Sequence, residues 1–86
     1  MKKVKKKVSE NGGLALKLVS PGFAGVPDRL VLFRGPKIAF VELKAPDKKL
    51  RVLQQKRKKQ LEALGFNVYK IDSYEAVDRL LEEMVL

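Results

Sequence analysis

The sequence predicts an α/β fold with a mixed (α+β) sheet, in which helices and strands follow the order α-β-β-β-α-β-α. Three short apolar segments between residues 14 and 44 are separated by Gly- and Pro-rich turns, which is typical of a strand meander. A helical pattern at 52–64 then precedes a fourth strand at 67–71, and such a crossover joins parallel strands. With 86 residues, the chain is expected to form one domain, residues 1–86, of marginal stability as a monomer.

The first part of the chain is predicted to contain a basic helix, a strand and a loop. Within residues 1–11, Val4 and Val8 have the i, i+4 spacing of a helix that buries one side. A frayed basic tail is the alternative. Residues 14–19 alternate weakly and are expected to form the first strand. The loop 20–25 is rich in small residues, which suits either a simple turn or a backbone that closely approaches a phosphate.

Residues 26–32 and 38–44 are predicted to be antiparallel strands of one hairpin, joined by a turn at 34–37. Both segments are rich in β-branched and aromatic residues, and a Gly-Pro pair separates them. If the turn is centred between Gly35 and Pro36, residues that pair across the hairpin have numbers that sum to about 71.

Charged residues inside this hairpin indicate a site. Glu42 and Lys44 alternate with Val41 and Leu43, so the two charged side chains share one face of the strand. The register places Asp28 close to Glu42 and Leu43. Two carboxylates beside a lysine suit Mg²⁺, which binds one or two protein carboxylates together with waters and phosphate oxygens. The pattern therefore points to phosphate chemistry with a bound metal.

The second half is predicted to contain a helix at 52–64, a strand at 67–71 and a final helix capped by Ser73. Tyr69 and Tyr74 are expected to be aromatic residues at the edge of the core. The final helix has an apolar stripe that should face the core, formed by Ala76, Val77, Leu80, Leu81 and Met84.

The composition limits the possible functions. The formal net charge is +9, with 19 Lys and Arg against 10 Asp and Glu, which attracts polyanions such as nucleic acid. The chain has no Cys and no His, which excludes thiol nucleophiles, histidine-based catalysis and Cys/His zinc sites. It also has no apolar run of the ~20 residues that a membrane span needs and no signal-peptide pattern. We therefore expect a soluble, intracellular protein that does not contact membranes.

Several segments, in order, resemble one nuclease family. Asp28 followed by Glu42-Leu43-Lys44 is similar to the Asp…Glu-x-Lys signature of the restriction-endonuclease-like, or PD-(D/E)XK, nucleases. More narrowly, residues 12–78 resemble the viral-type replication-repair nuclease (VRR-NUC) domain, through the segments KLVSPG, GVPDRL, FVELKAP and LQ. The resemblance implies a restriction-endonuclease-like core. Family members usually have a longer first helix with a glutamate at the metal site, a position that Glu10 does not match.

The resemblance also implies a metal-dependent DNA endonuclease. In this reading Asp28, Glu42 and the main-chain carbonyl of Leu43 hold Mg²⁺ or Mn²⁺. Lys44 orients or deprotonates the attacking water and offsets charge in the transition state, and Gln54 helps to place that water. In-line attack would leave 5′-phosphate and 3′-hydroxyl ends.

The expected partner is DNA, in a phage or in its bacterial host. Stand-alone members of the family are expected to be homodimers similar to Holliday-junction resolvases in DNA repair, cutting branched DNA. Flaps, nicks or single strands are alternative substrates, and a non-catalytic basic module in which Glu42 and Lys44 form an exposed ion pair is an alternative function. The residues expected to contact the DNA backbone are Lys17, Ser20, Arg29, Lys56, Lys58 and Lys59.

Overall fold

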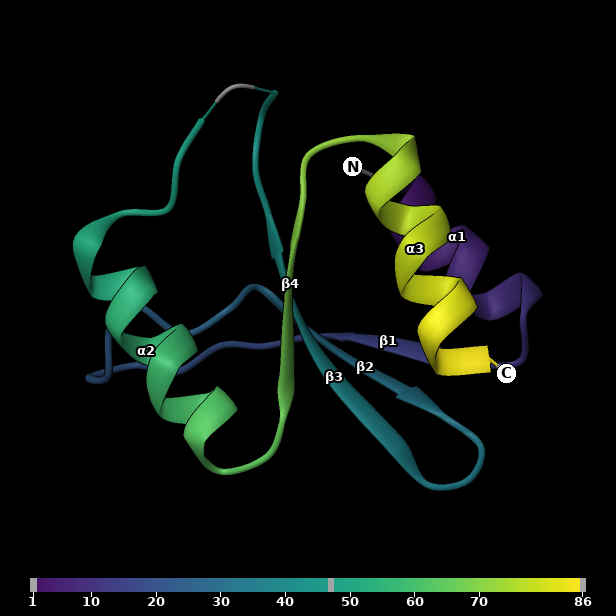
Figure 1. Ribbon diagram of the computed structural model, residues 1–86, viewed down its shortest axis with the longest axis horizontal. Coiled ribbons are helices and arrows are strands. Elements are labelled where there is room, and N and C mark those ends of the chain that lie inside the picture. The colour runs from purple at the N-terminus through teal and green to yellow at the C-terminus, as the bar shows by residue number, and fades with distance from the viewer. Residues whose placement is uncertain (1, 47, 86) are drawn as a thin grey trace.

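The computed structural model describes residues 2–46 and 48–85 as a four-stranded mixed sheet flanked by helices (Figure 1). The order of its elements confirms the predicted α-β-β-β-α-β-α. These elements are α1 (Lys2–Glu10), β1 (Leu14–Lys17), β2 (Arg29–Phe33), β3 (Lys37–Leu43), α2 (Val52–Ala63), β4 (Asn67–Ile71) and α3 (Tyr74–Val85). No helix in the described ranges has the length and apolar character needed to cross a membrane.

Several element ends differ from the prediction. The N-terminal segment is a helix from Lys2, while the predicted first residue, Met1, lies outside the described residues. The first strand ends at Lys17 rather than at residue 19, and the second begins at Arg29 rather than at residue 26. Proline has no N–H for a strand ladder, so Pro27 keeps the preceding residues in a loop.

The sheet has the strand order β1-β2-β3-β4, with β1, β2 and β3 antiparallel and β4 parallel to β3. In the hairpin, Arg29 pairs with Val41 and Leu30 with Phe40, so the numbers sum to 70 instead of the expected 71. The turn at residues 34–36 is centred on Gly35, which has a positive φ of 102°. In the parallel pair, Glu42 lies beside Lys70.

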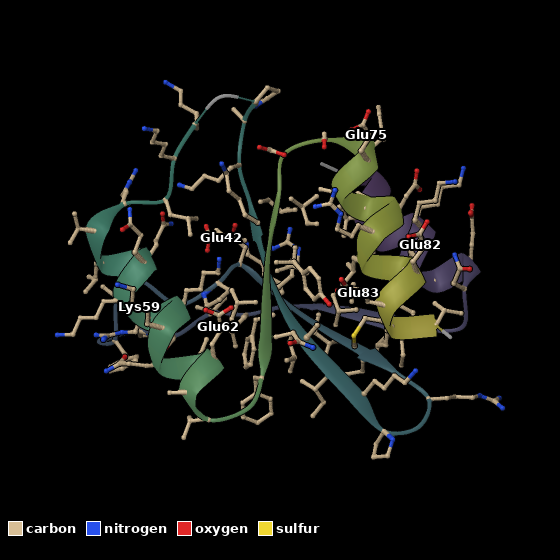
Figure 2. All side chains as sticks on the ribbon, in the orientation of Figure 1. Glu42, Lys59, Glu62, Glu75, Glu82 and Glu83 are labelled. Atoms are coloured by element: carbon tan, nitrogen blue, oxygen red, sulfur yellow. The ribbon has the colours of Figure 1, made fainter. Side chains whose placement is uncertain are left out.

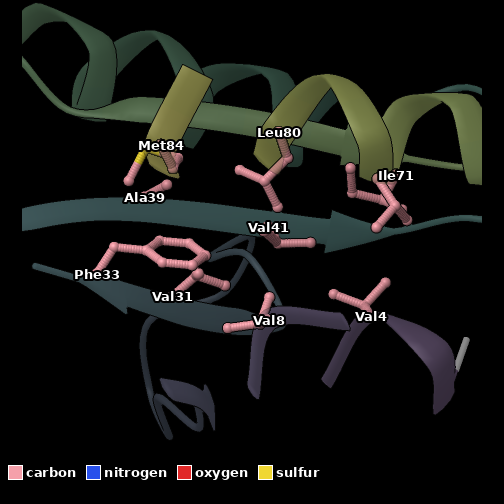
Figure 3. Close-up of a cluster of buried hydrophobic side chains, with 10 residues drawn as sticks. Val4, Val8, Val31, Phe33, Ala39, Val41, Ile71, Leu80 and Met84 are labelled. Atoms are coloured by element: carbon pink, nitrogen blue, oxygen red, sulfur yellow. The ribbon is translucent and has the colours of Figure 1, made fainter. Parts of the chain in front are cut away.

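The hydrophobic core lies between one sheet face and the two terminal helices, α1 and α3. Figure 3 shows Val4 and Val8 of α1, with Leu80 and Met84 of α3, packed on strand residues such as Val41. The predicted stripe of α3 is confirmed, since Val77, Leu80 and Met84 are buried and the other two members are partly buried against the core. The complete buried cluster is Val4, Val8, Val31, Phe33, Ala39, Val41, Ile71, Val77, Leu80 and Met84.

The opposite sheet face is only partly covered. Helix α2 packs on this face beside β4, where Phe40 meets Phe66 edge-on with ring centroids 5.7 Å apart. The rest of the face remains apolar and open to solvent, with Leu14 54% and Leu16 41% exposed. We call this surface the open sheet face, formed by Leu14, Leu16, Leu30, Leu32 and Ile38.

Gly25 holds the loop before β2 tightly against α2. Its φ is +88°, and an added Cβ would lie 2.8 Å from the carbonyl oxygen of Leu53 and 3.0 Å from Cγ of Arg57.

We expect Gly25→Ala to lower the free energy of unfolding by about 3 kcal/mol, because backbone strain and a steric clash add. Gly22→Ala is the matched control, with a similar φ of +78° and no atom within 4 Å of the added Cβ. It should lose only about 1 kcal/mol. Urea unfolding measures both, and equal losses would contradict this account.

Candidate active site

Two carboxylates face each other where β2 begins and β3 ends. Asp28 immediately precedes β2, and the pairing of Arg29 with Val41 places it opposite Glu42. The backbone N–H of Leu43 donates a hydrogen bond of 3.0 Å to Oδ2 of Asp28. The structure therefore brings Asp28, Glu42 and Leu43 together, as the hairpin register suggested.

Glu42 is a charged residue inside the protein, only 5% exposed. The pKa of Glu42 is raised from 4.5 to about 7, mainly by burial and in addition by the Asp28 charge and a hydrogen bond to the Asp28 side chain. Lys44 and Arg51 act in the opposite direction. The fold thus holds two acids so close that ionising both is unfavourable even with Lys44 and Arg51 nearby.

Gln54 fixes the position of Glu42 from the first turn of α2. Its Oε1 accepts a hydrogen bond of 2.9 Å from the backbone N–H of Arg51, directly before the helix. Its Nε2 donates a hydrogen bond of 3.0 Å to Oε1 of Glu42. Since one end of the amide is held by the helix terminus, the other end must present N–H groups to the carboxylate. Gln54 was expected near a water, and in the structure it contacts Glu42.

Two cations, Lys44 and Arg51, act on the charge of Glu42, and a third, Lys70, is its neighbour on β4. The sequence predicted only Lys44. Lys44 is half-buried directly after β3, and its backbone N–H donates to the carbonyl of Ile71 at 3.0 Å. Arg51 lies close enough to lower the pKa of Glu42. Lys70 lies beside Glu42 on β4, with its Nζ 3.5 Å from the carboxylate of Asp72. The register of the parallel pair places Lys70 beside Glu42. This register depends on how α2 packs, so no local sequence pattern predicts the position of Lys70.

The donor set suits a small divalent cation. Among residues 2–46 and 48–85, no group of three or more Asp, Glu, Cys or His side chains could hold a metal. Mg²⁺ needs only one or two carboxylates because waters and phosphate oxygens complete its shell, and Asp28 with Glu42 provides that number. A cation here would also offset the repulsion that raises the pKa of Glu42. Glu10 is exposed on α1, across the sheet from these residues.

The six predicted DNA contacts fall into two groups. Lys17 pairs with Arg29, which pairs with Val41, so these two basic residues belong to the sheet face opposite Glu42. Ser20 is half-buried in the loop before β2. The other three, Lys56, Lys58 and Lys59, belong to α2, the helix that carries Gln54.

Helix α2 carries a run of basic residues, Lys56, Arg57, Lys58 and Lys59, beside one acid, Glu62. Figure 2 shows Lys59 and Glu62 on α2, and Glu75, Glu82 and Glu83 on α3 across the sheet. The basic residues of α2 therefore lie on the side of the sheet that carries Glu42, where they would attract a polyanion.

No family model matches the sequence, but comparison with known proteins finds related chains. A protein described as a candidate nuclease, p44 of Acyrthosiphon pisum secondary endosymbiont phage 1, is 50% identical over 66 residues, which cover 77% of this chain and 71% of that protein. A solved structure of a VRR_NUC domain superposes with a TM-score of 0.87 at 34% identity, covering 94% of this chain and 88% of the other.

Proposed function

The chain belongs to the VRR-NUC family of nucleases, and we propose that it hydrolyses phosphodiester bonds of DNA with bound Mg²⁺ or Mn²⁺. The observation that carries this proposal is the buried Glu42, which faces Asp28, is held by Gln54 and shares its strand face with Lys44. A buried, crowded carboxylate is unfavourable for stability alone, and such arrangements are typical of catalytic sites.

Each residue of the site has a role that follows from its contacts. Asp28, Glu42 and the Leu43 carbonyl would hold the metal, which when bound supplies a Lewis acid and a template for the phosphate. The hydrogen bond from Leu43 N–H holds one oxygen of Asp28, and Gln54 holds one oxygen of Glu42. Lys44 carries a positive charge to the same place, where it can orient a water and offset the charge that develops on the phosphate.

Helix α2 gives the DNA a basic surface beside this site. Lys56 and Lys59 are exposed and Lys58 is half-buried on the helix whose first turn contacts Glu42. Such lysines neutralise backbone phosphates without reading bases. Arg57 instead stacks on Phe23, 3.8 Å from the ring centroid, and donates to the carbonyl of Ala24. Its role is to fix the loop before Asp28.

We also propose that the protein acts as a homodimer through the open sheet face. Leu14, Leu16 and Ile38 are 54%, 41% and 39% exposed on adjoining strands, and an apolar sheet face of this kind is typically covered by another element or chain. Dimerisation would also add buried surface to a domain that is small for an independent fold. Two sites related by a twofold axis suit symmetric cuts in a four-way junction.

Cleavage of labelled four-way junction, flap, nicked and linear DNA tests this function. We expect cutting with Mg²⁺ or Mn²⁺, none with EDTA, and a dimer in sedimentation of the same preparation. Symmetric cuts in the junction would support the resolvase-like reading, while preference for a flap would keep the chemistry and change the substrate. DNA binding without cleavage under any metal would refute the catalytic proposal and favour a basic binding module.

A further inference from the structure

A pocket of about 540 Å³ lies directly beside the catalytic lysine. Its walls are residues 43–46, which follow β3, and residues 72–74, which follow β4. Lys44 therefore belongs both to this pocket and to the carboxylate site. Nothing in the roles assigned above to the metal, the water or the DNA backbone uses this space.

The topology of the sheet creates the pocket. Strands β3 and β4 are parallel neighbours, and their carboxyl ends lie side by side. The chain leaves β3 towards α2 on one face of the sheet and leaves β4 towards α3 on the other, as Figure 1 shows. Where neighbouring parallel strands send their connections to opposite faces, a crevice opens outside their carboxyl ends, and ligands bind there. The volume is in the range of small-molecule sites, about 300–1,000 Å³.

The lining of the pocket is mostly apolar and includes an aromatic ring. Ala45 and Pro46 provide small apolar surfaces, and Tyr74 is 57% exposed at the start of α3. The expectation that Tyr74 lies at the edge of the core is therefore wrong, whereas Tyr69 does pack against the core. The acidic member of the wall, Asp72, lies 3.5 Å from the ammonium of Lys70, so its charge is partly offset.

We propose that this pocket holds one unpaired nucleobase of the DNA, stacked on Tyr74, from a nucleotide that flanks the scissile phosphate. The inference rests on the proposed nuclease function and adds a substrate class to it. A flat base matches an apolar slot with an aromatic wall, and base stacking on aromatic side chains is tolerant of sequence. Lys44 borders both places, so the pocket with Tyr74 in its wall adjoins the carboxylate site, where a bound metal would hold the phosphate that is cut.

A base inside a continuous duplex cannot enter such a pocket. It is stacked on both sides and paired, and extracting it costs a few kcal/mol, least where the base is already unpaired. The pocket therefore favours cutting at flaps, gaps or other places with an unpaired nucleotide over cutting of intact linear duplex.

A chemical double-mutant cycle tests the proposal. The substrates are a series of flap DNAs, each with one abasic nucleotide at a different position of the unpaired strand. KM and kcat are measured on this series for wild type, Tyr74→Ala and Tyr74→Phe. With wild type, an abasic nucleotide at one position should raise KM about 10-fold. Tyr74→Ala should raise KM by a similar factor on intact DNA and show no further loss at that position, while Tyr74→Phe should behave as wild type. Leu64→Ala, which also removes an exposed apolar side chain (73% exposed), is the control.

A binding version of the same cycle separates this proposal from the nuclease assignment. It uses the Glu42→Gln protein, with and without Tyr74→Ala, and measures the Kd for the same DNA set in EDTA. If wild type cuts no DNA, the nuclease proposal fails, and the binding cycle still reports on the pocket. Equal effects of the abasic nucleotide in both Tyr74 backgrounds, or no effect of it at any position, would overturn the pocket proposal while wild-type cleavage stands.

Discussion

Replacing Glu42 by Gln should lower the cleavage rate by about 10³-fold or more, and it should also make the metal-free protein more stable at pH 8. The first effect arises because the amide cannot supply the negative charge that a divalent cation needs beside Asp28. The second arises because Gln keeps the shape and can accept the hydrogen bond from Gln54, but needs no ionisation. A gain in stability with a loss of activity would mark Glu42 as a functional carboxylate.

The sign of the pH dependence follows from the raised pKa. Glu42 has a pKa of about 7 in the folded protein against an ordinary 4.5, so the folded state binds its proton more tightly than the unfolded state. The contribution of the Glu42 proton to the free energy of unfolding is complete below pH 4.5. This contribution, up to about 3 kcal/mol, is lost as the pH rises through 7. The chain has no His or Cys, so besides the α-amino group few other groups titrate in this window.

Urea unfolding at pH 5.5 and pH 8, without metal, measures this effect. Wild type should be less stable at pH 8, and Glu42→Gln should lose most of that difference. Adding Mg²⁺ should restore wild type at pH 8 and leave the variant unchanged. Glu82→Gln changes an exposed carboxylate on α3 and is the control. Parallel pH profiles for wild type and Glu42→Gln would show that Glu42 is not held in this way.

The second large effect is expected for Lys44→Ala, which should lower kcat by about 10²- to 10³-fold and change KM for DNA much less. Lys44 is one charge among many for DNA attraction, but in the proposed reaction it acts at the phosphate that is cut. Lys48→Ala, an exposed lysine in the connection after it, is the matched control and should change kcat little. If Lys44→Ala raises KM and leaves kcat unchanged, as loss of a simple DNA contact would, Lys44 acts only in DNA binding.

A second readout of Lys44→Ala does not depend on catalysis. The Lys44 charge lowers the pKa of Glu42, so removing it should move the pH midpoint of the stability loss upwards. The same urea experiment without metal detects this shift. An unchanged midpoint would mean that the ammonium of Lys44 is farther from Glu42 than the structure places it.

The order of the elements, the parallel crossover and the meeting of Asp28 with Glu42 could be predicted, whereas Lys70 beside Glu42 and the exposure of Tyr74 could not. Asp28 and Glu42 meet through a hairpin, whose register depends on one short turn, so counting residues was sufficient. The start of β2 was missed because Pro27 and the tight contact of Gly25 with α2 override the apolar pattern of residues 26–28. The residues that β4 and α3 place beside the site were not predicted, for a different reason.

Lys70 and Tyr74 illustrate that reason. Lys70 lies beside Glu42 only because β4 pairs in parallel with β3 after a crossover, and the register of such a pair is fixed by helix packing. Tyr74 has the composition of a core-edge aromatic, but it is the first residue of α3 and lies past the end of the sheet, where it remains exposed. The exposure of a side chain at the start of a helix depends on where the helix crosses the sheet. The spacing of apolar residues in the sequence does not contain that information.

The groups that hold the site around Glu42 come from widely separated parts of the chain, so they become available one after another as the protein is synthesised. Asp28 and Glu42 can pair as soon as the hairpin has left the ribosome, but Gln54 arrives later and the carbonyl of Ile71, which holds Lys44, later still. Chains are made at about 5–20 residues per second and fold progressively as they emerge. A partly made chain therefore carries its acids without the groups that position them. The site is therefore complete only after β4, the last strand, has formed.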